Sequence, residues 1–367
     1  MIHRVKSTIN LKALTNNLEI ARSHAKNRKI VAVIKANAYG HGLIPAAEAL
    51  QAADIYGVTD VNEADQLTAA GTDKTILILQ GIIERADIAR IAEAGYQVVI
   101  HSLKQISWLE DELSNITLTK PLRFWLKMNS GMGRLGIMPA DFTAAYQNLQ
   151  GKPWCQEVIL MTHMANANLK DSELNQQQLD TFSEITKQIP EAATSIQASS
   201  ALLASYGESA DWVRPGIMLY GSSPFAFSDE QSRRESFGLQ AVMTLQARLI
   251  SIQDCKAGDN IGYCSQFICP HDMRIGIVSI GYADGYPSNA PNGTPVLING
   301  KRTVTTGRVS MDMLAIDLSP APDAQIGDSV TLWGDDLSLD EIAEHTGILS
   351  YNLTCSIANR VAREYKN

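Results

Sequence analysis

From about residue 29 to about residue 221 the chain repeats one pattern, in which a short apolar stretch is followed by a polar turn and a longer segment with helical spacing. Short apolar runs rich in β-branched residues are typical of buried strands. Eight such runs alternating with helical segments favour a parallel (β/α)8 barrel over an open sheet. The predicted strands lie in IVAVIKANA, IYGVTD, KTILILQ, YQVVIHS, PLRFWLKMN, EVILMTHMA and SIQASS, with an eighth near residues 216–220.

The pattern changes after about Glu235, where strand-like segments are separated by Gly, Pro and Asp turns. These segments are LQAVMTLQARLISI, MRIGIVSIGYA, TPVLINGKRTV, MLAIDL and DSVTLWG, followed by a helical pattern in SLDEIAEHTG. We therefore expect an α/β fold of two domains. The barrel would span residues 10–234, and a mainly β domain would span residues 235–367 and include residues 1–9.

Charge and composition narrow the class of protein. The chain has 31 Lys and Arg against 39 Asp and Glu, and its basic residues are scattered, so neither nucleic acid nor an anionic membrane is expected as a partner. The five cysteines form no spacing typical of a zinc site, and we expect no metal. The first residues offer no apolar signal-peptide core, and no later run approaches the roughly 20 apolar residues of a membrane span. We expect a cytoplasmic protein.

Polar residues follow many of the predicted barrel strands. Catalytic groups of (β/α)8 barrels lie at the carboxyl ends of the strands, so the side chains at these positions are expected to converge on one face. They are Lys35, Lys127, Arg134, His163, Ser199, Ser200 and Arg214.

Lys35 ends the first predicted strand, in IVAVIKANAYGHG. Desolvation and neighbouring cations make such an amine nucleophilic, as in Schiff-base lysines. The segment RPGIMLYG, from Arg214 to Gly221, places glycines where the eighth strand turns outward, and barrel enzymes commonly seat a phosphate after strands seven and eight. Ser200 adds a hydroxyl nearby. A lysine beside a phosphate seat predicts pyridoxal 5'-phosphate as the cofactor.

The chain resembles the alanine racemase family over nearly its whole length. The segments that carry the resemblance, in the family's order, are VIKANAYGHG, LKMNSGMGRLG, THMAN, DWVRPGIMLYG, IGYCSQF, GYADGY and GRVSMDM. The resemblance implies a barrel plus a β domain. It also implies an isomerase that uses pyridoxal phosphate to interconvert L-alanine and D-alanine, either supplying D-alanine for peptidoglycan or serving alanine catabolism.

The resemblance also implies how the cofactor is held. Lys35 would carry it as a Schiff base, and Arg214 would face its pyridine nitrogen. A permanently charged guanidinium leaves that nitrogen unprotonated, whereas a carboxylate would keep it protonated, so transamination and decarboxylation are disfavoured. The residues implied to contact the phosphate are Tyr39, Ser200, Gly216, Ile217 and Tyr351.

Racemisation needs one base on each face of Cα. The resemblance assigns Lys35 to one face and Tyr263 to the other. A tyrosine with a pKa of about 10 is a poor base at neutral pH, and lowering that pKa by three units corresponds to roughly 4 kcal/mol. By resemblance, His163 lies in a hydrogen-bonded chain between Tyr263 and Arg214, whose positive charge favours the phenolate.

The resemblance assigns further residues to the substrate. Arg134 would bind its carboxylate, because a guanidinium offers a planar pair of donors. Lys127 matches a lysine that is carbamylated in many family members, and we expect the same modification here to position Arg134. Met311 and Asp312 would contact the substrate, and Tyr282 would lie near the entrance or the carboxylate.

Tyr263, Tyr282 and Met311 fall in the predicted β domain, whereas Lys35 and Arg214 fall in the barrel. In the family such groups meet across a head-to-tail dimer, in which each active site uses the β domain of the other subunit. We therefore expect an obligate homodimer with two equal active sites.

Three alternatives share parts of this pattern. A racemase of broader specificity would act on serine, lysine or ornithine, although bulky Tyr263, Tyr351 and Met311 suit the methyl group of alanine. A barrel protein that binds pyridoxal phosphate only for cofactor homeostasis would lack the β domain and therefore Tyr263. A decarboxylase with the same two domains would place an acidic residue against the pyridine nitrogen, where this chain has Arg214.

Overall fold

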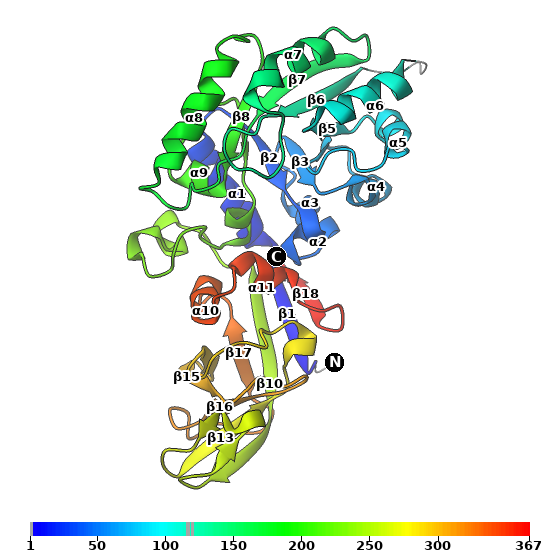
Figure 1. The fold of residues 1–367 in the computed structure, drawn as a ribbon. Coiled ribbons are helices and arrows are strands. Elements are labelled where there is room, and N and C mark those ends of the chain that lie inside the picture. The colour runs from blue at the N-terminus through cyan, green and yellow to red at the C-terminus, as the bar shows by residue number, and fades with distance from the viewer. Residues whose placement is uncertain (1–2, 115–117, 119–120) are drawn as a thin grey trace. The chain divides into compact units, whose positions relative to one another are not determined.

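The structure is a computed structural model that describes residues 3–114, 118 and 121–367. The chain forms two compact units. We call residues 18–38 and 46–219 the barrel unit, and residues 1–17, 39–45 and 220–367 the β unit. Figure 1 labels many of their elements, and each unit is described by itself.

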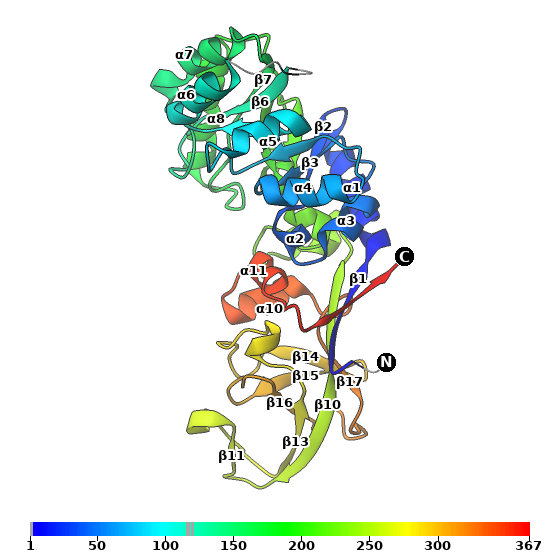
Figure 2. The same cartoon turned by 90° about the vertical axis from the view of Figure 1, so that its right-hand side faces the viewer.

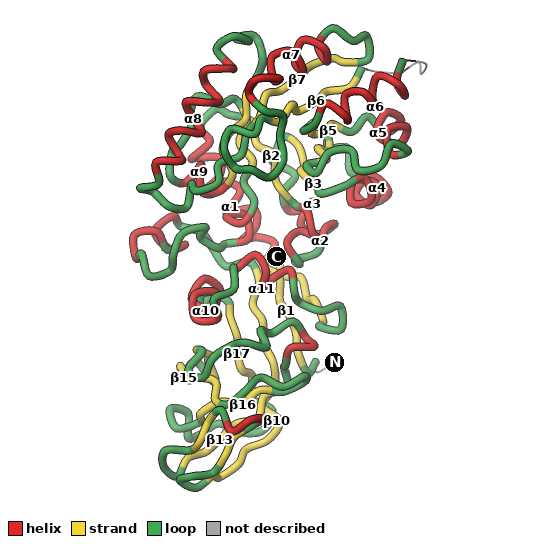
Figure 3. The backbone as a smooth tube through the Cα atoms, viewed as in Figure 1, coloured by secondary structure: helices red, strands yellow, loops and turns green. Residues whose placement is uncertain are grey.

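The barrel unit contains eight parallel strands that close into a barrel, which confirms the expected (β/α)8 fold. The last strand pairs with the first, with Lys29 opposite Trp212. Figure 3 shows the strands enclosed by helices. The strands are β2 (Lys29–Val33), β3 (Ile55–Val58), β4 (Ile76–Ile78), β5 (Gln97–Ile100), β6 (Leu122–Lys127), β7 (Cys155–Met161), β8 (Thr194–Ala198) and β9 (Trp212–Arg214).

The helices alternate with these strands, as the periodicity predicts. They are α1 (Leu11–Ala25), α3 (Leu43–Ala49), α4 (Val61–Ala69), α5 (Asp87–Ala94), α6 (Leu103–Leu113), α7 (Pro139–Gln150), α8 (Glu173–Thr186) and the short α9 (Ser199–Leu203).

Large apolar side chains fill the barrel interior. Trp125 of β6 and Trp212 of β9 meet edge to face, with ring centroids 5.3 Å apart. The indole N–H of Trp125 donates to Oε1 of buried Gln97 at 2.7 Å, which satisfies a polar group that is costly to bury unpaired. The buried apolar residues that pack together inside the barrel are Val31, Ile55, Leu77, Val99, Trp125, Ile159, Met161 and Trp212.

The position expected for the eighth barrel strand, near residues 216–220, is wrong. The apolar residues Ile217–Tyr220 form a 3-10 helix (η1), and the strand is the earlier segment β9. Pro215 interrupts the strand because it has no N–H to donate, although its carbonyl still accepts from Val33 N at 3.0 Å. The run at 217–220 is apolar because it is buried after the strand has ended.

The first strand also ends earlier than expected. β2 stops at Val33, and the segment α2 (Lys35–Tyr39) is a left-handed turn. Ala36, Asn37 and Ala38 have φ values of 54°, 53° and 53°, and Tyr39 has 52°. The left-handed conformation costs roughly 1–2 kcal/mol per non-glycine residue, so such a turn persists only where its surroundings hold it.

Two kinds of contact hold this turn. Within the barrel unit, Ala38 N donates to Ile34 O at 2.8 Å, and Asn37 N donates to Oε1 of Glu63 at 3.0 Å. Within the β unit, the buried ring of Tyr39 stacks on Tyr220 with centroids 4.6 Å apart. The direction of Lys35 is therefore set by an over-determined turn and not by the strand before it.

The β unit is built on one eight-stranded sheet in the order β13-β16-β15-β14-β17-β10-β1-β18. Figure 2 shows the ribbon containing β11 projecting near the end of long strand β10. The strands are β1 (Val5–Asn10), β10 (Met243–Cys255), β13 (Met273–Val278), β14 (Pro295–Ile298), β15 (Lys301–Thr306), β16 (Leu314–Asp317), β17 (Ser329–Trp333) and β18 (Ala362–Lys366). Smaller elements are β11 (Asn260–Ile261), η4 (Tyr263–Ser265), β12 (Phe267–Ile268), η5 (Tyr282–Asp284), α10 (Leu339–Thr346) and α11 (Ser350–Cys355).

The left-handed turn predicts opposite effects for two alanine-to-glycine substitutions. Ala36 is exposed, and A36G removes the Cβ that disfavours its conformation, so we expect the free energy of unfolding to rise by about 0.5–1 kcal/mol. Ala144 is exposed on right-handed α7, and A144G should lower it by about 1 kcal/mol. Chemical denaturation measures both. Equal losses in the two variants would contradict the left-handed turn.

Candidate active site

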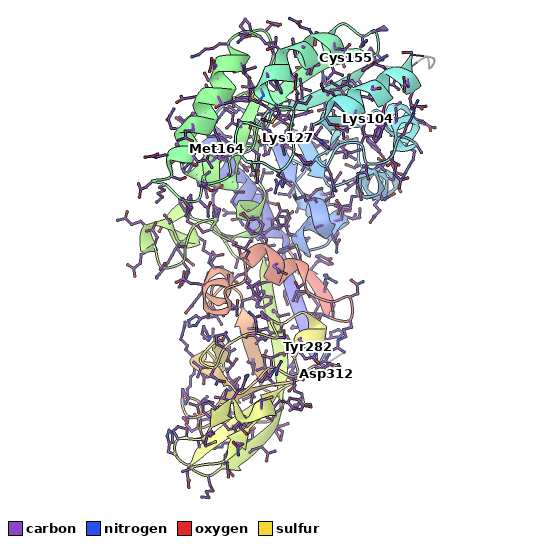
Figure 4. All side chains as sticks on the ribbon, in the orientation of Figure 1. Lys104, Lys127, Cys155, Met164, Tyr282 and Asp312 are labelled. Atoms are coloured by element: carbon purple, nitrogen blue, oxygen red, sulfur yellow. The ribbon has the colours of Figure 1, made fainter. Side chains whose placement is uncertain are left out.

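Five of the predicted residues meet at the carboxyl ends of the barrel strands. Lys35 follows β2, Lys127 ends β6, His163 follows β7 and Arg214 ends β9, while Arg134 lies in the loop between β6 and α7. Figure 4 labels Lys127 within the barrel unit. The charges of Lys35, Arg134 and Arg214 each act on both Lys127 and His163, so these groups form one basic cluster.

Burial and mutual repulsion change the titration of the cluster. Burial, followed by the charges of Arg214, Arg134 and Lys35, lowers the pKa of Lys127 to about 8. Burial first and Arg214 next hold the pKa of His163 well below its usual value. Burial lowers the pKa of Arg214 to about 10, which leaves the guanidinium charged at neutral pH. A neutral histidine therefore faces a permanent cation.

Arg214 is fixed by contacts inside the barrel unit. Its guanidinium donates to Ser195 Oγ, to Thr162 O at 2.7 Å and to Ile196 O at 3.2 Å. It also lies 3.5 Å from His163 Nδ1. A guanidinium has no acceptor, so His163 Nδ1 must accept, and we assign the proton of the neutral ring to Nε2. His163 can then donate a hydrogen bond from Nε2.

Three of the cluster's cations have no counterion among the described residues. Within the described part of the chain, none of Lys127, Arg134 and Arg214 forms an ion pair with a carboxylate. Lys127 and Arg214 are nevertheless buried, and buried cations without a partner are costly. This donor set fits an anionic group such as a phosphate or a carboxylate. The described residues contain no group of three or more His, Cys, Asp and Glu placed to hold a metal ion.

The turn after β9 is held by a serine that the sequence did not assign to the phosphate seat. Buried Ser199, at the start of α9, accepts from Gly216 N at 2.8 Å and from Met218 N at 3.3 Å through its Oγ. Gly216 and Ile217 are buried, and neighbouring Ser200 is partly exposed. The N–H of Gly216 is thus already paired with Ser199. A hydroxyl at the start of a helix after the seventh strand is the signal that points to this role.

In the β unit, Tyr39 belongs to a group of rings. Its centroid lies 4.6 Å from Tyr220 and 6.0 Å from Tyr351, and His41 stacks on Tyr220 at 4.7 Å. Burial raises the pKa of Tyr351 to about 12 and that of Tyr39 still further above its usual value. Both tyrosines therefore keep their phenol protons and can donate hydrogen bonds.

A buried carboxylate supports the segment that carries Tyr351. Asp340 accepts from Ser222 Oγ and from Ser223 N at 2.9 Å, and Ser222 Oγ also lies 2.7 Å from Ser350 Oγ. Burial raises the pKa of Asp340 to about 6, against the opposing effect of these hydrogen bonds. The sequence did not reveal this residue, because an acidic residue in the first turn of a helix is usually exposed.

The remaining predicted residues lie on the surface of the β unit. Tyr263 is 68% exposed, Tyr282 is 45% exposed and Met311 is 54% exposed, although all three are large and largely apolar. Figure 4 labels Tyr282 and Asp312 near each other in this unit. Backbone bonds join their loops, since Tyr282 N donates to Ser310 O at 3.1 Å and Ala283 N donates to Met311 O at 3.0 Å.

Hydrogen bonds of Asp284 and its arginine partners hold these two loops together. Its fully buried carboxylate accepts from Arg4 at 2.6 Å and 3.1 Å, from Arg360 Nε at 2.8 Å and from Gly281 N at 3.1 Å. Arg360 also donates to Asp312 at 2.5 Å. Gly281 must lack a side chain, because a Cβ there would lie 2.2 Å from Ser310 O. Asp284 lies in the motif GYADGY, but nothing in the sequence indicates that its carboxylate is buried and paired with two arginines.

Models of known protein families match both parts of the chain. The description "Alanine racemase, N-terminal domain" covers residues 9–224, and "Alanine racemase, C-terminal domain" covers residues 242–365. The chain belongs to the alanine racemase family. Its membership confirms the resemblance carried by the sequence motifs.

Several members of the alanine racemase family are similar over nearly their whole length. "Alanine racemase, catabolic" of Pseudomonas putida is 44% identical over 361 residues, covering 98% of each chain. The alanine racemase of Pseudomonas taetrolens is 43% identical with the same coverage. The solved biosynthetic alanine racemase of Pseudomonas aeruginosa covers 100% of both chains with a TM-score of 0.94 and 40% identity.

The architecture of this family member therefore follows a known pattern in both units. The alanine racemase structure from Acinetobacter baumannii also covers 100% of both chains, with a TM-score of 0.92 and 34% identity. None of the helices in the described ranges has both the length and the apolar character that a membrane crossing requires.

Proposed function

We propose that this chain interconverts L-alanine and D-alanine with pyridoxal 5'-phosphate as its cofactor. The observation that carries the proposal is the basic cluster at the barrel mouth, where Lys127, Arg134 and Arg214 have no carboxylate partner among the described residues. A substrate carboxylate and a carbamate on Lys127 would supply negative charge that such a cluster stabilises. Membership in the family, and the names of relatives about 44% identical, support alanine as the substrate.

The residues of the chain fit the cofactor's chemical groups. Lys35 would hold the aldehyde carbon as a Schiff base, and charged, donor-only Arg214 would face the pyridine nitrogen. When bound, the cofactor withdraws electrons from Cα and thereby stabilises the negative charge left by proton removal. The protonated phenols of Tyr39 and Tyr351 suit a phosphate acceptor. The proposed phosphate ligands are Tyr39, Ser200, Gly216, Ile217 and Tyr351.

The two proton transfers are assigned to Lys35 and Tyr263, on opposite faces of Cα. Neutral His163 supports this assignment, because its Nε2 proton can be donated to a phenolate oxygen while Arg214 fixes Nδ1. The chain from arginine to histidine to tyrosine would stabilise the base form of Tyr263 without placing a full positive charge beside it. One base would remove the Cα proton from its own face, and the other would donate its own proton to Cα on the opposite face.

The substrate carboxylate is assigned to Arg134, whose side chain is exposed at the barrel mouth. A carbamate on Lys127 would turn one cation of the cluster into an anion and pair with Arg134. Met311, Asp312 and Tyr282 complete the proposed substrate contacts. The bonds between the 281–284 turn and the 310–312 loop support their acting together.

A homodimer with shared active sites explains the exposed residues of the β unit. Tyr263, Tyr282 and Met311 are too apolar to be favoured on a free surface, and a partner subunit would cover them. We propose that Tyr263 of each subunit serves the Lys35 site of its partner. In a twofold dimer this arrangement gives two equal sites.

Chiral analysis tests the reaction. L-alanine incubated with the protein and pyridoxal phosphate in deuterated water should yield D-alanine with deuterium at Cα, because the returned proton comes from groups that exchange with solvent. L-serine and L-lysine are the parallel substrates. Absence of both D-alanine and exchange would refute racemisation, as expected for a cofactor-homeostasis protein, and faster turnover of lysine would establish a broader racemase instead.

Tyr263→Phe separates the two bases. The variant keeps the ring and loses the phenol oxygen, so the cofactor absorbance should be unchanged. Proton removal from L-alanine should fall by roughly 100-fold or more, as for other lost acid–base groups. Exchange of the Cα proton in deuterated water is measured separately for each enantiomer, and normal exchange of both would disprove the assignment.

Mixing two inactive variants tests the shared site. In a hybrid of Lys35→Ala and Tyr263→Phe subunits, one site has both bases intact and the other has neither. Random re-assembly should therefore restore about a quarter of the wild-type activity, because half of the dimers are hybrids with one working site each. Light scattering confirms the dimer. No recovery in re-assembled dimers would place both bases on the same subunit.

The lowered pKa of Lys127 predicts when it takes up CO2. Carbamate formation joins an uncharged amine to CO2 and releases one proton, and a pKa of about 8 makes the uncharged amine abundant above that pH. At constant CO2 pressure, the carbon NMR signal of labelled carbamate should grow between roughly pH 7 and 9. K127R keeps a charge and should give none. A signal that does not change with pH would contradict the lowered pKa.

A further inference from the structure

The buried face of α8 carries two polar residues, Asn175 and Gln178. Gln178 is completely buried, whereas Gln176 on the same helix is exposed and its side chain donates to Asp180 at 2.8 Å. Burying an amide costs free energy unless every donor and acceptor finds a partner. Apolar residues fill most such positions, so the contacts of Gln178 indicate what it does.

The amide of Gln178 joins two loops at the barrel mouth. Its Nε2 donates to His163 O at 3.1 Å and to Ser130 Oγ at 3.3 Å. Its Oε1 accepts from Ala165 N at 2.8 Å. One side chain therefore connects the loop after β7, which contains His163, with the loop after β6, which contains Arg134.

The two loops are joined again next to this amide. The hydroxyls of Ser130 and Thr162 lie 2.7 Å apart, and Thr162 Oγ1 also donates to Met128 O at 3.2 Å. The carbonyl of Thr162 accepts from Arg214 at 2.7 Å. The result is a continuous network from α8 through Gln178, Ser130 and Thr162 to Arg214. All these groups lie in the barrel unit.

The loop that carries Arg134 also packs against Gln178. Gly131 has φ +141°, and a Cβ there would lie 3.1 Å from Gln178 Cγ, so the loop rests directly on this side chain. Gly131 N and Gly133 N are held within the loop by Asn129 Oδ1, at 3.3 Å and 3.0 Å. Gln178 and Ser130 thus act together with the bonds of Met128 in setting where the loop lies relative to His163.

We propose that Gln178 is a positioning residue that holds the Arg134 loop and the His163 loop in one fixed arrangement, so that the substrate carboxylate and the hydrogen-bonded chain through His163 are aligned. This inference rests on the proposed racemase function. It requires that loss of the amide changes the function of the two loops, and not only the stability of the barrel.

Gln178→Met tests the proposal, because methionine fills a similar volume without donors or acceptors. Gln176→Met is the matched control on the exposed face of α8. We expect KM for alanine to rise roughly tenfold in Q178M, with a smaller fall in kcat, since one charge-orienting hydrogen-bond network is lost. Q176M should retain the wild-type KM and kcat.

A second readout does not depend on activity. Amide hydrogen exchange of residues 129–136, measured without cofactor, should become at least several-fold faster in Q178M and stay unchanged in Q176M. Ser130→Ala removes the bonds of the Arg134 loop to Gln178 and to Thr162, keeps the bonds of Gln178 to His163 and Ala165, and should raise KM alone. The double variant should be no worse in KM than Q178M, because both changes break the same path.

The outcomes separate the two proposals. A wild-type protein without racemase activity would refute the proposed function. An active wild type whose Q178M variant keeps the KM and loop exchange of Q176M, even at lower thermal stability, would refute the positioning role. If Q178M does not fold, S130A decides the question, and an unchanged KM and loop exchange in that variant would overturn the inference.

Discussion

Uncompensated positive charge at the barrel mouth is the constraint on which the site depends. Lys127 and Arg214 are buried, and the charge of Arg214 acts on Lys127. Within the described ranges, Lys127, Arg134 and Arg214 form no ion pair with a carboxylate. Such an arrangement is costly in an empty protein and favourable around anions, because buried charges need partners. Burial, followed by the same field, keeps His163 neutral and lowers the pKa of Lys127 to about 8, so that His163 can donate a hydrogen bond and Lys127 loses its proton more readily than an ordinary lysine.

The barrel maintains this arrangement through groups that do not themselves react. Thr162 and Ser195 fix Arg214, Ser199 holds the turn after β9, and Gln178 connects two of the loops. The left-handed turn after Lys35 is also maintained by groups around it, because its strained backbone persists only where hydrogen bonds and ring stacking hold it. Strain and unpaired charge are thus concentrated where a cofactor and substrate would relieve or use them.

The β unit shows the opposite character. Its proposed reactive residues are exposed. The hydrogen bonds that hold their loops are made by buried Asp284, which accepts from Arg4, Arg360 and the turn at Gly281. A buried carboxylate held by two arginines ties the exposed loops together, since removing the carboxylate would leave both arginines without this partner. An exposed but rigid surface is suited to completing a site on a partner subunit.

The sequence by itself determined the alternation of strands and helices, the change to β structure and the basic residues at the strand ends, because periodicity and strand position are local properties. Its motifs also determined the family. Only the tertiary structure decided that β9 ends before Pro215, that residues 36–39 turn left-handed, and that Gln178 and Asp284 are buried. These features depend on partners distant in the chain, as Ser130 is from Gln178 and Arg4 is from Asp284. Burial and pairing of that kind arise from packing and leave no periodic signal.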